Sequence, residues 1–233
     1  MYTRSYFLKT KRYKEVIAPR DPEVDLPLAT FLQNNLPKGS KILEVGGGSG
    51  YLLKLIGDRG LFNLFNVEVV PWVYKQQADP SINLIGGDAL KLPFKNGSFD
   101  CVIIKSVLHH LVGKTRKESK LNAYLCIREL KRVTKGFIVI SELYNEDRFA
   151  SFLLFYITKF LSRLNIGLPF MGHDKGVIVS MLTPTEIFKF LGREKNTKFL
   201  FIKKVRYKVL LRQYITGLWR NVGMILIICK IYK

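Results

Sequence analysis

Acidic and glycine residues occur at a spacing that could bind a nucleotide-like ligand. Glu44 opens the pattern acid-x-Gly-x-Gly-x-Gly, and a second acid, Glu68, follows the first glycine at close to the ~20 residues typical of ribose-binding acids. Glycines let the backbone turn tightly and approach a ligand, and carboxylate oxygens accept hydrogen bonds from ribose hydroxyls. A dinucleotide-binding loop would carry its third glycine where Tyr51 stands. The pattern therefore favours a different glycine loop, formed by Gly46, Gly47, Gly48 and Gly50.

Three more motifs follow this loop in order. The first reads Gly-Asp-Ala around Asp88 and continues into Leu-Pro-Phe, the second is Ser-Phe-Asp at residues 98–100, and the third is Leu-His-His-Leu at residues 108–111. Together with the glycine loop they resemble the small-molecule branch of the class I S-adenosylmethionine-dependent methyltransferases, which includes the ubiquinone and menaquinone C-methyltransferases. The resemblance covers roughly Lys41 to Leu143.

The resemblance implies S-adenosylmethionine as the cofactor and assigns roles to its binding residues. Glu44 would orient the glycine loop or the amino group of the cofactor, Glu68 would bind the ribose, and Asp88 would accept from the adenine amino group. Lys105 is unusual beside a sulfonium ion because like charges repel, so its side chain either points away or contributes only its stem. The implied set is Glu44, Gly46, Gly47, Gly48, Gly50, Glu68, Val69, Asp88, Ala89, Lys105 and Ser106.

Two adjacent histidines, His109 and His110, follow the fourth predicted strand and are the candidate catalytic residues. An imidazole near the transferred methyl group could act as a general base, but such a pair could equally pack and hydrogen-bond beside the cofactor. Glu142 and Tyr144, after the fifth strand, are weaker candidates, and His173 is weaker still. The sequence contains no characteristic metal-ligand spacing, so we predict no metal.

Alternating strand and helix patterns must position these residues. They predict an α/β domain with a Rossmann-like, doubly wound sheet that binds its ligand at the carboxyl ends of the strands. By resemblance the sheet has seven strands, mostly parallel, with an antiparallel last strand. The later strands are expected at Phe137–Ser141, Phe199–Tyr207 and Val222–Ile231, and the helices at Asp25–Asn35, Ser49–Gly57, Pro71–Ala78, Arg116–Val133 with Gly136 as its C-cap, and Pro184–Leu191.

The chain of 233 residues is expected to form a single methyltransferase domain. Residues 1–40 would be a basic segment and helix, 41–143 the cofactor-binding core, 144–182 an apolar insert, and 183–233 a C-terminal helix and strand pair. The insert contains a Phe-rich helix that could form a lid over an apolar substrate. A packed core helix and a dimer interface are the alternatives, and the sequence does not indicate the oligomeric state.

Charge and composition bear on partners and location. The chain carries a formal net charge of +20, of which residues 147–233 hold +12 and residues 1–20 hold +5. Basic ends of this kind can attract RNA, an anionic membrane or an acidic small substrate, or reflect only a lysine-rich composition. Without a secretory signal or a long apolar run, a cytoplasmic protein is expected. The cysteines Cys101, Cys126 and Cys229 are expected to be dispersed thiols, with the first and last of them buried.

The predicted function is methyl transfer from S-adenosylmethionine to a small acceptor, with an apolar, lipid-like or quinone acceptor as the hypothesis. An RNA methyltransferase is the main alternative, although the Asn/Asp-Pro-Pro-aromatic motif of amino-group methylation is replaced here by Lys105-Ser106-Val107-Leu108. Lys105 and Glu142 could supply two members of the Lys-Asp-Lys-Glu set that ribose methylation uses. A non-catalytic S-adenosylmethionine-binding module is the third alternative.

Overall fold

A computed structural model describes residues 21–57, 60–70, 79–167, 176–193, 196–206, 218 and 221–232. The basic residues 1–20, the helix expected at Pro71–Ala78 and the candidate His173 lie outside these ranges. Within the described ranges, no helix is both long enough and apolar enough to cross a membrane.

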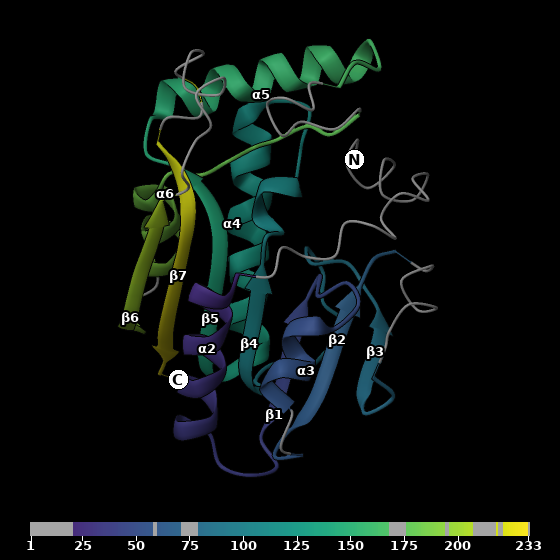
Figure 1. The fold of residues 1–233 in the computed structure, drawn as a ribbon, viewed down its shortest axis with the longest axis vertical. Coiled ribbons are helices and arrows are strands. Elements are labelled where there is room, and N and C mark those ends of the chain that lie inside the picture. The colour runs from purple at the N-terminus through teal and green to yellow at the C-terminus, as the bar shows by residue number, and fades with distance from the viewer. Residues whose placement is uncertain are drawn as a thin grey trace.

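A seven-stranded sheet forms the centre of the molecule, in the order β3-β2-β1-β4-β5-β7-β6 (Figure 1). β1 to β5 are parallel, whereas β7 runs antiparallel to both of its neighbours. This arrangement confirms the predicted Rossmann-like α/β fold with an antiparallel last strand. The strands are β1 (Lys41–Val45), β2 (Asn63–Glu68), β3 (Ile82–Gly86), β4 (Phe99–Lys105), β5 (Thr134–Asn145), β6 (Thr197–Arg206) and β7 (Val222–Ile231).

Helices cover both faces of the sheet (Figure 1). α2 and α3 pack on one face, and α4 and α6 pack on the other. Thr183 and Glu186 form a capping box at the start of α6. The helical elements are α2 (Pro22–Asn35), α3 (Tyr51–Gly57), the 3-10 turn η3 (Leu108–His110), α4 (Arg116–Val133), α5 (Arg148–Arg163) and α6 (Pro184–Gly192).

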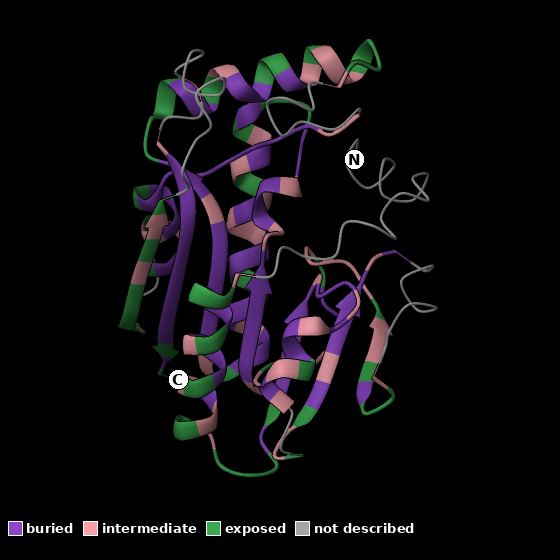
Figure 2. Cartoon of the chain, viewed as in Figure 1, coloured by how far each residue is buried: buried purple, intermediate pink, exposed green. Residues whose placement is uncertain are grey.

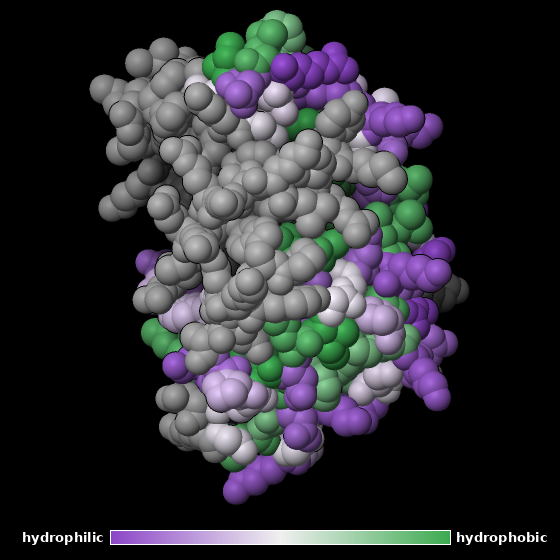
Figure 3. Space-filling view, turned by 90° about the vertical axis from the view of Figure 1, so that its right-hand side faces the viewer, coloured by the Kyte–Doolittle hydropathy of each residue, from purple (hydrophilic) through white to green (hydrophobic). Residues whose placement is uncertain are grey.

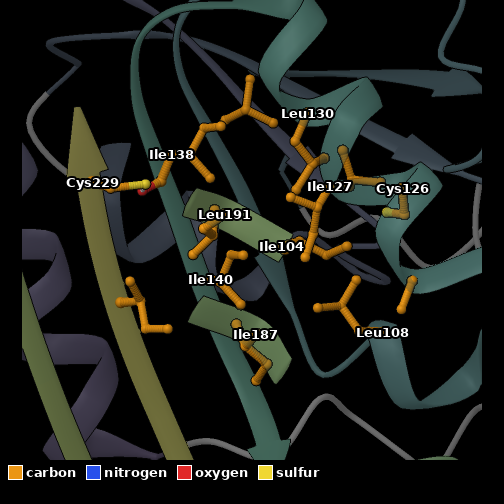
Figure 4. Close-up of a cluster of buried hydrophobic side chains, with 14 of the residues drawn as sticks. Ile104, Leu108, Cys126, Ile127, Leu130, Ile138, Ile140, Ile187, Leu191 and Cys229 are labelled. Atoms are coloured by element: carbon orange, nitrogen blue, oxygen red, sulfur yellow. Dashed lines mark hydrogen bonds between the residues drawn. The ribbon is translucent and has the colours of Figure 1, made fainter. Parts of the chain in front are cut away.

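Two apolar clusters, one on each face of the sheet, form the core. On the face covered by α4 and α6, Ile127 and Leu130 of α4 and Leu191 of α6 pack with Ile104 and Ile138 of the strands (Figure 4). The central strands are buried along almost their whole length (Figure 2), as strands covered on both faces should be. The free cysteines Cys101, Cys126 and Cys229 are all buried, as predicted for the first and the last.

The end of α4 differs from the prediction because a glycine serves strand packing instead of capping. α4 ends at Val133 and β5 begins at Thr134, so Gly136 lies inside the strand rather than at a helix C-cap. A Cβ on Gly136 would overlap the backbone carbonyl oxygen of Asp100 in β4. The glycine therefore permits the close approach of two backbones, a contact that local sequence does not reveal.

Candidate functional site

A cavity of about 260 Å³ opens at the carboxyl ends of the parallel strands. This is where α/β sheets of this type bind ligands, and the volume is near the lower end of the range of roughly 300–1,000 Å³ for ligand pockets. Six of the predicted cofactor residues line the cavity, together with one predicted catalytic residue. They are Gly46, Glu68, Val69, Asp88, Ala89 and Ser106, with His110. The remaining predicted residues lie outside its lining.

The glycine loop after β1 follows a backbone path that residues with a side chain avoid. Gly46, Gly48 and Gly50 have φ angles of 73°, 53° and 77°, in the left-handed region. At Gly46 a Cβ would also lie only 2.6 Å from Cγ2 of Val107. At Gly48, in contrast, no atom of the described residues lies within 4 Å of such a Cβ. Gly46 therefore presents bare backbone at the cavity, which suits close approach of a ligand, whereas Gly48 lies outside the cavity lining.

Asn66 holds the glycine loop in place and was not predicted from the sequence. Its Oδ1 accepts a hydrogen bond from the N–H of Gly47 at 3.1 Å, and its Nδ2 donates to the carbonyl oxygen of Gly48 at 2.9 Å. The side chain is fully buried in β2, and a Cβ on Gly47 would collide with it. A buried amide needs polar partners. The sequence signal for this role of Asn66 was therefore the presence of an asparagine inside an apolar strand.

Both oxygens of the Glu68 carboxylate are held by backbone N–H groups at the end of β2. Oε1 accepts from Val69 and Val70 at 2.8 and 3.2 Å, and Oε2 accepts from Gly48 at 3.3 Å. Burial raises the pKa of Glu68 above its usual value, although these three N–H groups offset part of the shift. A carboxylate has about four acceptor positions, so Glu68 can still accept from hydroxyl groups of a ligand in the cavity.

Glu44 lies under the glycine loop rather than in the cavity. Its carboxyl group is so close to Gly47 that a Cβ there would lie 2.6 Å from Glu44 Oε2. That oxygen has no hydrogen-bond partner among the described residues. Burial raises the pKa of Glu44 to about 7, and the positive charge of Lys105 counteracts part of the rise. Both roles predicted for Glu44 stay predictions.

Replacing Glu44 with glutamine should stabilise the protein at alkaline pH. The pKa rises from 4.5 to about 7 on folding, so the folded protein binds an extra proton in this window and stability falls as pH rises through it. At about 1.4 kcal/mol per pKa unit, the ionised group costs on the order of 3 kcal/mol above the window. Urea unfolding should show a larger gain for Glu44→Gln above pH 7 than at pH 4.5.

The matched control for this prediction is Glu23→Gln, which changes an exposed carboxyl group on α2. We expect the stability of that variant to track the wild type across the same pH range. A gain for Glu44→Gln that is equal at both ends of the range would contradict the assigned cause.

Lys105 forms a buried ion pair with Asp25 of α2. Its ammonium group is outside the cavity lining, so of the two alternatives for this residue the structure has the one in which it points away. Breaking such a pair would leave an uncompensated buried charge, which typically costs about 3–5 kcal/mol. The pair links α2 to the end of β4 and places a positive charge near Glu44.

Ser106, directly after β4, combines a strained backbone with an unpaired hydroxyl group. Its φ angle is 54°, which is uncommon for a residue with a side chain. Its N–H donates to the carbonyl oxygen of Ser141 at 2.8 Å, which holds the backbone in this conformation. The residue lines the cavity, and its Oγ is buried and has no hydrogen-bond partner among the described residues. Strain and an unsatisfied donor at one position are typical of ligand contacts.

Asp88 and Ala89 line the cavity after β3. Oδ1 of Asp88 accepts from the N–H of Leu90 at 2.9 Å, an Asx-type turn that fixes the direction of the carboxylate. Val69, after β2, lines the cavity as well. This part of the site therefore combines one oriented acceptor with small and apolar side chains, as a heteroaromatic base requires.

Glu142, at the end of β5, organises the turn that carries the two histidines. Its Oε2 accepts from the N–H groups of Val107 and Leu108 at 3.1 and 2.6 Å, and its Oε1 lies 2.5 Å from Nδ1 of His109. His109 is thereby fixed outside the cavity lining, and its ring lies 3.9 Å from that of His110, centroid to centroid. Burial, with the neighbouring His109, lowers the pKa of His110 well below its usual value, so this ring is neutral at neutral pH.

The structure also shows which further residues lie at the cavity and which lie away from it. Tyr144, a weaker candidate, is buried between β5 and β7, where its hydroxyl approaches Gly223. Asn122 of α4 was not predicted but lines the cavity, with Nδ2 donating to the carbonyl oxygen of Leu111 at 3.3 Å. Val112 was also missed and adds apolar surface.

These features fit S-adenosylmethionine. The open space above Gly48, the oriented carboxylates of Glu68 and Asp88 and the unpaired hydroxyl of Ser106 supply a bare backbone cradle and several polar contacts. The strand order and the position of the cavity define the fold of a class I methyltransferase.

Comparison with known proteins agrees with this class. The family described as "Methyltransferase domain" matches residues 43–139. The chain is 32% identical over 133 residues to the demethylmenaquinone methyltransferase of Renibacterium salmoninarum, which covers 54% of this chain and 49% of that protein. It is 32% identical over 116 residues to a tRNA (carboxymethyluridine(34)-5-O)-methyltransferase of Arabidopsis thaliana, which covers 49% of this chain and 26% of that protein. The matched region thus spans between a quarter and a half of these relatives.

Solved structures share the fold across almost the whole chain. A SAM-dependent methyltransferase from Methanosarcina mazei superposes with a TM-score of 0.61 at 15% identity, covering 87% of this chain and 97% of that chain. A protein from Pyrococcus horikoshii superposes with a TM-score of 0.58 at 17% identity, covering 96% and 93%. Residues 43–139 therefore match the methyltransferase domain family, as the resemblance in the sequence predicted, and this match implies S-adenosylmethionine as the cofactor. The solved structures show that the fold is shared.

Proposed function

We propose that this protein transfers a methyl group from S-adenosylmethionine to a small acceptor, and that residues 1–233 act as one methyltransferase domain. The observation that carries the proposal is the cavity at the carboxyl ends of the strands. Its lining includes Glu68, Asp88 and His110. A cofactor held by the carboxylates would thus lie within reach of an acceptor beside the histidine.

The roles of the cofactor residues follow from their contacts. Glu68 would accept from the ribose hydroxyls, and Asp88 from the adenine amino group, with the backbone of Ala89 beside it. Gly46 and Ser106 would lie along the methionine part, and the backbone of Gly48 would contact the cofactor. S-adenosylmethionine supplies an activated methyl group when it is bound. The protein's part is to align the acceptor and exclude water.

His110 is the residue that we assign to proton removal from the acceptor. Its lowered pKa keeps the imidazole neutral and able to accept a proton. His109 and Glu142 would act as positioning residues, because their contact at 2.5 Å fixes the ring against which His110 lies. Glu142 also holds the backbone of the same turn.

Replacing His110 with asparagine should lower kcat by about a hundredfold, the lower end of the effect of a general base. Binding of S-adenosylhomocysteine should change only a few-fold. Because the pKa of His110 is well below 6.5, the midpoint of the acidic limb of the wild-type pH–rate profile should lie below pH 6.5. This limb should be absent from the profile of the variant. An acidic limb at or above that value, or an unchanged kcat, would contradict the assignment.

An apolar or lipid-like acceptor is the version of the proposal that the cavity supports best. Beside His110 the lining consists of the apolar residues Val107, Leu111 and Val112. One relative is named as a demethylmenaquinone methyltransferase, whose acceptor is of this kind.

The expectation of a cytoplasmic protein stays a prediction.

An RNA acceptor is the second candidate. It is favoured by the net charge of +20, since cationic surfaces attract phosphate backbones, and by the relative named as a tRNA methyltransferase. A radiolabelled methyl group can distinguish the two acceptors. Incubation of the protein and labelled S-adenosylmethionine with a lipid extract should label the organic phase, and incubation with bulk tRNA should leave the RNA unlabelled. Label in tRNA alone would overturn the preferred version, and His110→Asn is the control for enzymatic transfer.

A further inference from the structure

α5 has two apolar faces, and the described part of the chain covers only one of them. Ala150, Leu154, Phe155 and Thr158 face inward and are buried. On the opposite side, Phe149 and Phe160 are 68% and 60% exposed, and they are joined by three more large apolar side chains of the helix at helical spacing. These are Phe152, Tyr156 and Ile157. A helix on a water-exposed surface normally carries polar residues on its outer side, so this face has an unassigned role.

The charged residues of α5 are all basic. Arg148 and Arg163 are exposed, whereas the ammonium group of Lys159 donates to the carbonyl oxygen of Lys114 and lies over the ring of Phe155. Two acids precede the helix. Asp147 is engaged as the N-cap, with Oδ1 accepting from the N–H groups of Phe149 and Ala150, and Glu146 pairs with Lys204 and Arg206 of β6. The outer surface of α5 therefore pairs an aromatic stripe with positive charge and carries no acidic residue between Arg148 and Arg163.

The position of α5 connects this surface to the cavity. α5 lies across the end of the molecule toward which the parallel strands point (Figure 1). Its Phe155 packs with Val112 and Ile178 in a separate apolar cluster, and Val112 also lines the cavity. In Figure 3 green apolar and purple hydrophilic side chains lie side by side at the top, where α5 lies in Figure 1. Apolar side chains thus lead from the cavity to the inner side of α5.

We propose that the outer face of α5 docks on an anionic lipid surface, and that the protein takes its acceptor from that surface. The second clause rests on the proposed function with an apolar acceptor; the docking itself does not. Phenylalanines, a tyrosine and an isoleucine opposite a protein-bound face, flanked by two exposed arginines, are the composition of helices that lie in the headgroup region of a bilayer. The basic flank would face anionic headgroups, each cation adding to the attraction.

Two other occupants fit the surface less well. Pairing of α5 with a second copy across a two-fold axis would bring the same arginines of both copies toward one another, and like charges repel. RNA would satisfy the arginines but would leave most of the aromatic stripe without apolar contact, although bases can stack on single rings. The lipid surface is the occupant that matches both the apolar stripe and the charge.

Flotation with phosphatidylcholine vesicles that contain phosphatidylglycerol tests the apolar part of the proposal. The wild type should bind, and Phe149→Ser with Phe160→Ser should bind roughly tenfold more weakly, because each ring loses its apolar burial in the lipid. The matched control is Leu26→Ser with Leu121→Ser, whose side chains are 54% and 51% exposed on α2 and α4. The control should bind like the wild type, and circular dichroism checks that all variants are folded.

The charge part is tested with Arg148→Glu and Arg163→Glu in one variant. We expect roughly tenfold weaker binding or more, since each basic residue near an anionic surface is worth about 1 kcal/mol. Lys38→Glu with Lys95→Glu changes the net charge equally, but these exposed residues precede β1 and β4, at the amino ends of the strands. This control should keep most of the binding, and vesicles of phosphatidylcholine alone should bind the wild type much more weakly.

Three results would overturn the docking proposal. They are absence of binding of the wild type to anionic vesicles, equal losses in the α5 variants and their controls, and a wild-type dimer that the two serine changes convert to a monomer. Calorimetry with S-adenosylhomocysteine separates this proposal from the proposed function. If the wild type bound vesicles but not S-adenosylhomocysteine, the docking surface would stand and the methyltransferase proposal would fail. If the wild type bound S-adenosylhomocysteine but not vesicles, the methyltransferase proposal would stand and the docking proposal would fail.

Discussion

Replacement of Glu68 with alanine is expected to weaken binding of S-adenosylhomocysteine by about a thousandfold. The carboxylate would accept hydrogen bonds from two ribose hydroxyls, and a hydrogen bond to a charged group is worth about 1.5–3 kcal/mol. The variant also loses the acceptor that holds the N–H of Gly48 at 3.3 Å, so the glycine loop becomes less well ordered. Isothermal titration calorimetry measures the change directly.

Two comparison variants separate the ribose contacts from a general effect on folding. Glu68→Gln keeps the size of the side chain and one carbonyl acceptor but loses the charge, so its affinity should fall between those of the wild type and Glu68→Ala. Glu23→Ala removes an exposed acid of α2 and should bind normally. Equal affinity in the wild type and a well-folded Glu68→Ala variant would remove Glu68 from the site.

Replacement of Gly46 with alanine should have a second large effect, on both stability and binding. The residue has a φ angle of 73°, which costs a side-chain-bearing residue about 1–2 kcal/mol. The new Cβ would also lie 2.6 Å from Cγ2 of Val107, so Val107 must move within the cavity that it lines. We expect a loss of about 2–4 kcal/mol in the free energy of unfolding and roughly a hundredfold weaker binding of S-adenosylhomocysteine.

Gly39→Ala is the matched control for this change. Gly39 has a φ angle of 79°, but no atom of the described residues lies within 4 Å of a Cβ there. The control therefore has a similar free-energy cost from its positive φ angle, without a steric clash like that with Val107. It should lose about 1–2 kcal/mol of stability and keep its affinity for S-adenosylhomocysteine. A similar loss of affinity in both variants would show that the contact with Val107 is not the cause.

Much of the fold could be predicted because local sequence patterns indicate its strands and turns. The acid near the end of β1, the glycines after β1 and the Gly-Asp-Ala run after β3 identify strand ends and the turns that follow them. Parallel strands bring such ends to one edge of the sheet, so motifs far apart in sequence predict one cavity. The resemblance to a family added the antiparallel last strand, which periodicity alone does not indicate.

The residues that sequence could not place depend on long-range contacts. Lys105 and Asp25 are 80 positions apart and meet only because α2 packs at the end of β4. Asn66 looks like an unfavourable residue in an apolar strand until the glycine loop supplies its partners. Gly136 has the typical sequence position of a helix cap, but the approach of β4 decides its role.

The Phe-rich segment illustrates a different limit. Its sequence is compatible with a lid, a core helix or an interface, because hydrophobicity alone does not state what covers a side chain. The structure shows that α5 buries one side and exposes Phe149 and Phe160 on the other. The sequence therefore predicted the helix correctly, and only the packing of its inner face revealed the uncovered surface.

Calorimetric titration of the wild-type protein with S-adenosylhomocysteine tests the central claim most directly. The account predicts binding of one ligand per chain, weakened in both Glu68→Ala and Asp88→Ala, whose carboxylates line the same cavity. Absence of binding by the folded wild type would contradict the assignment of this cavity to S-adenosylmethionine, and the glycine loop would then belong to a site for another nucleotide.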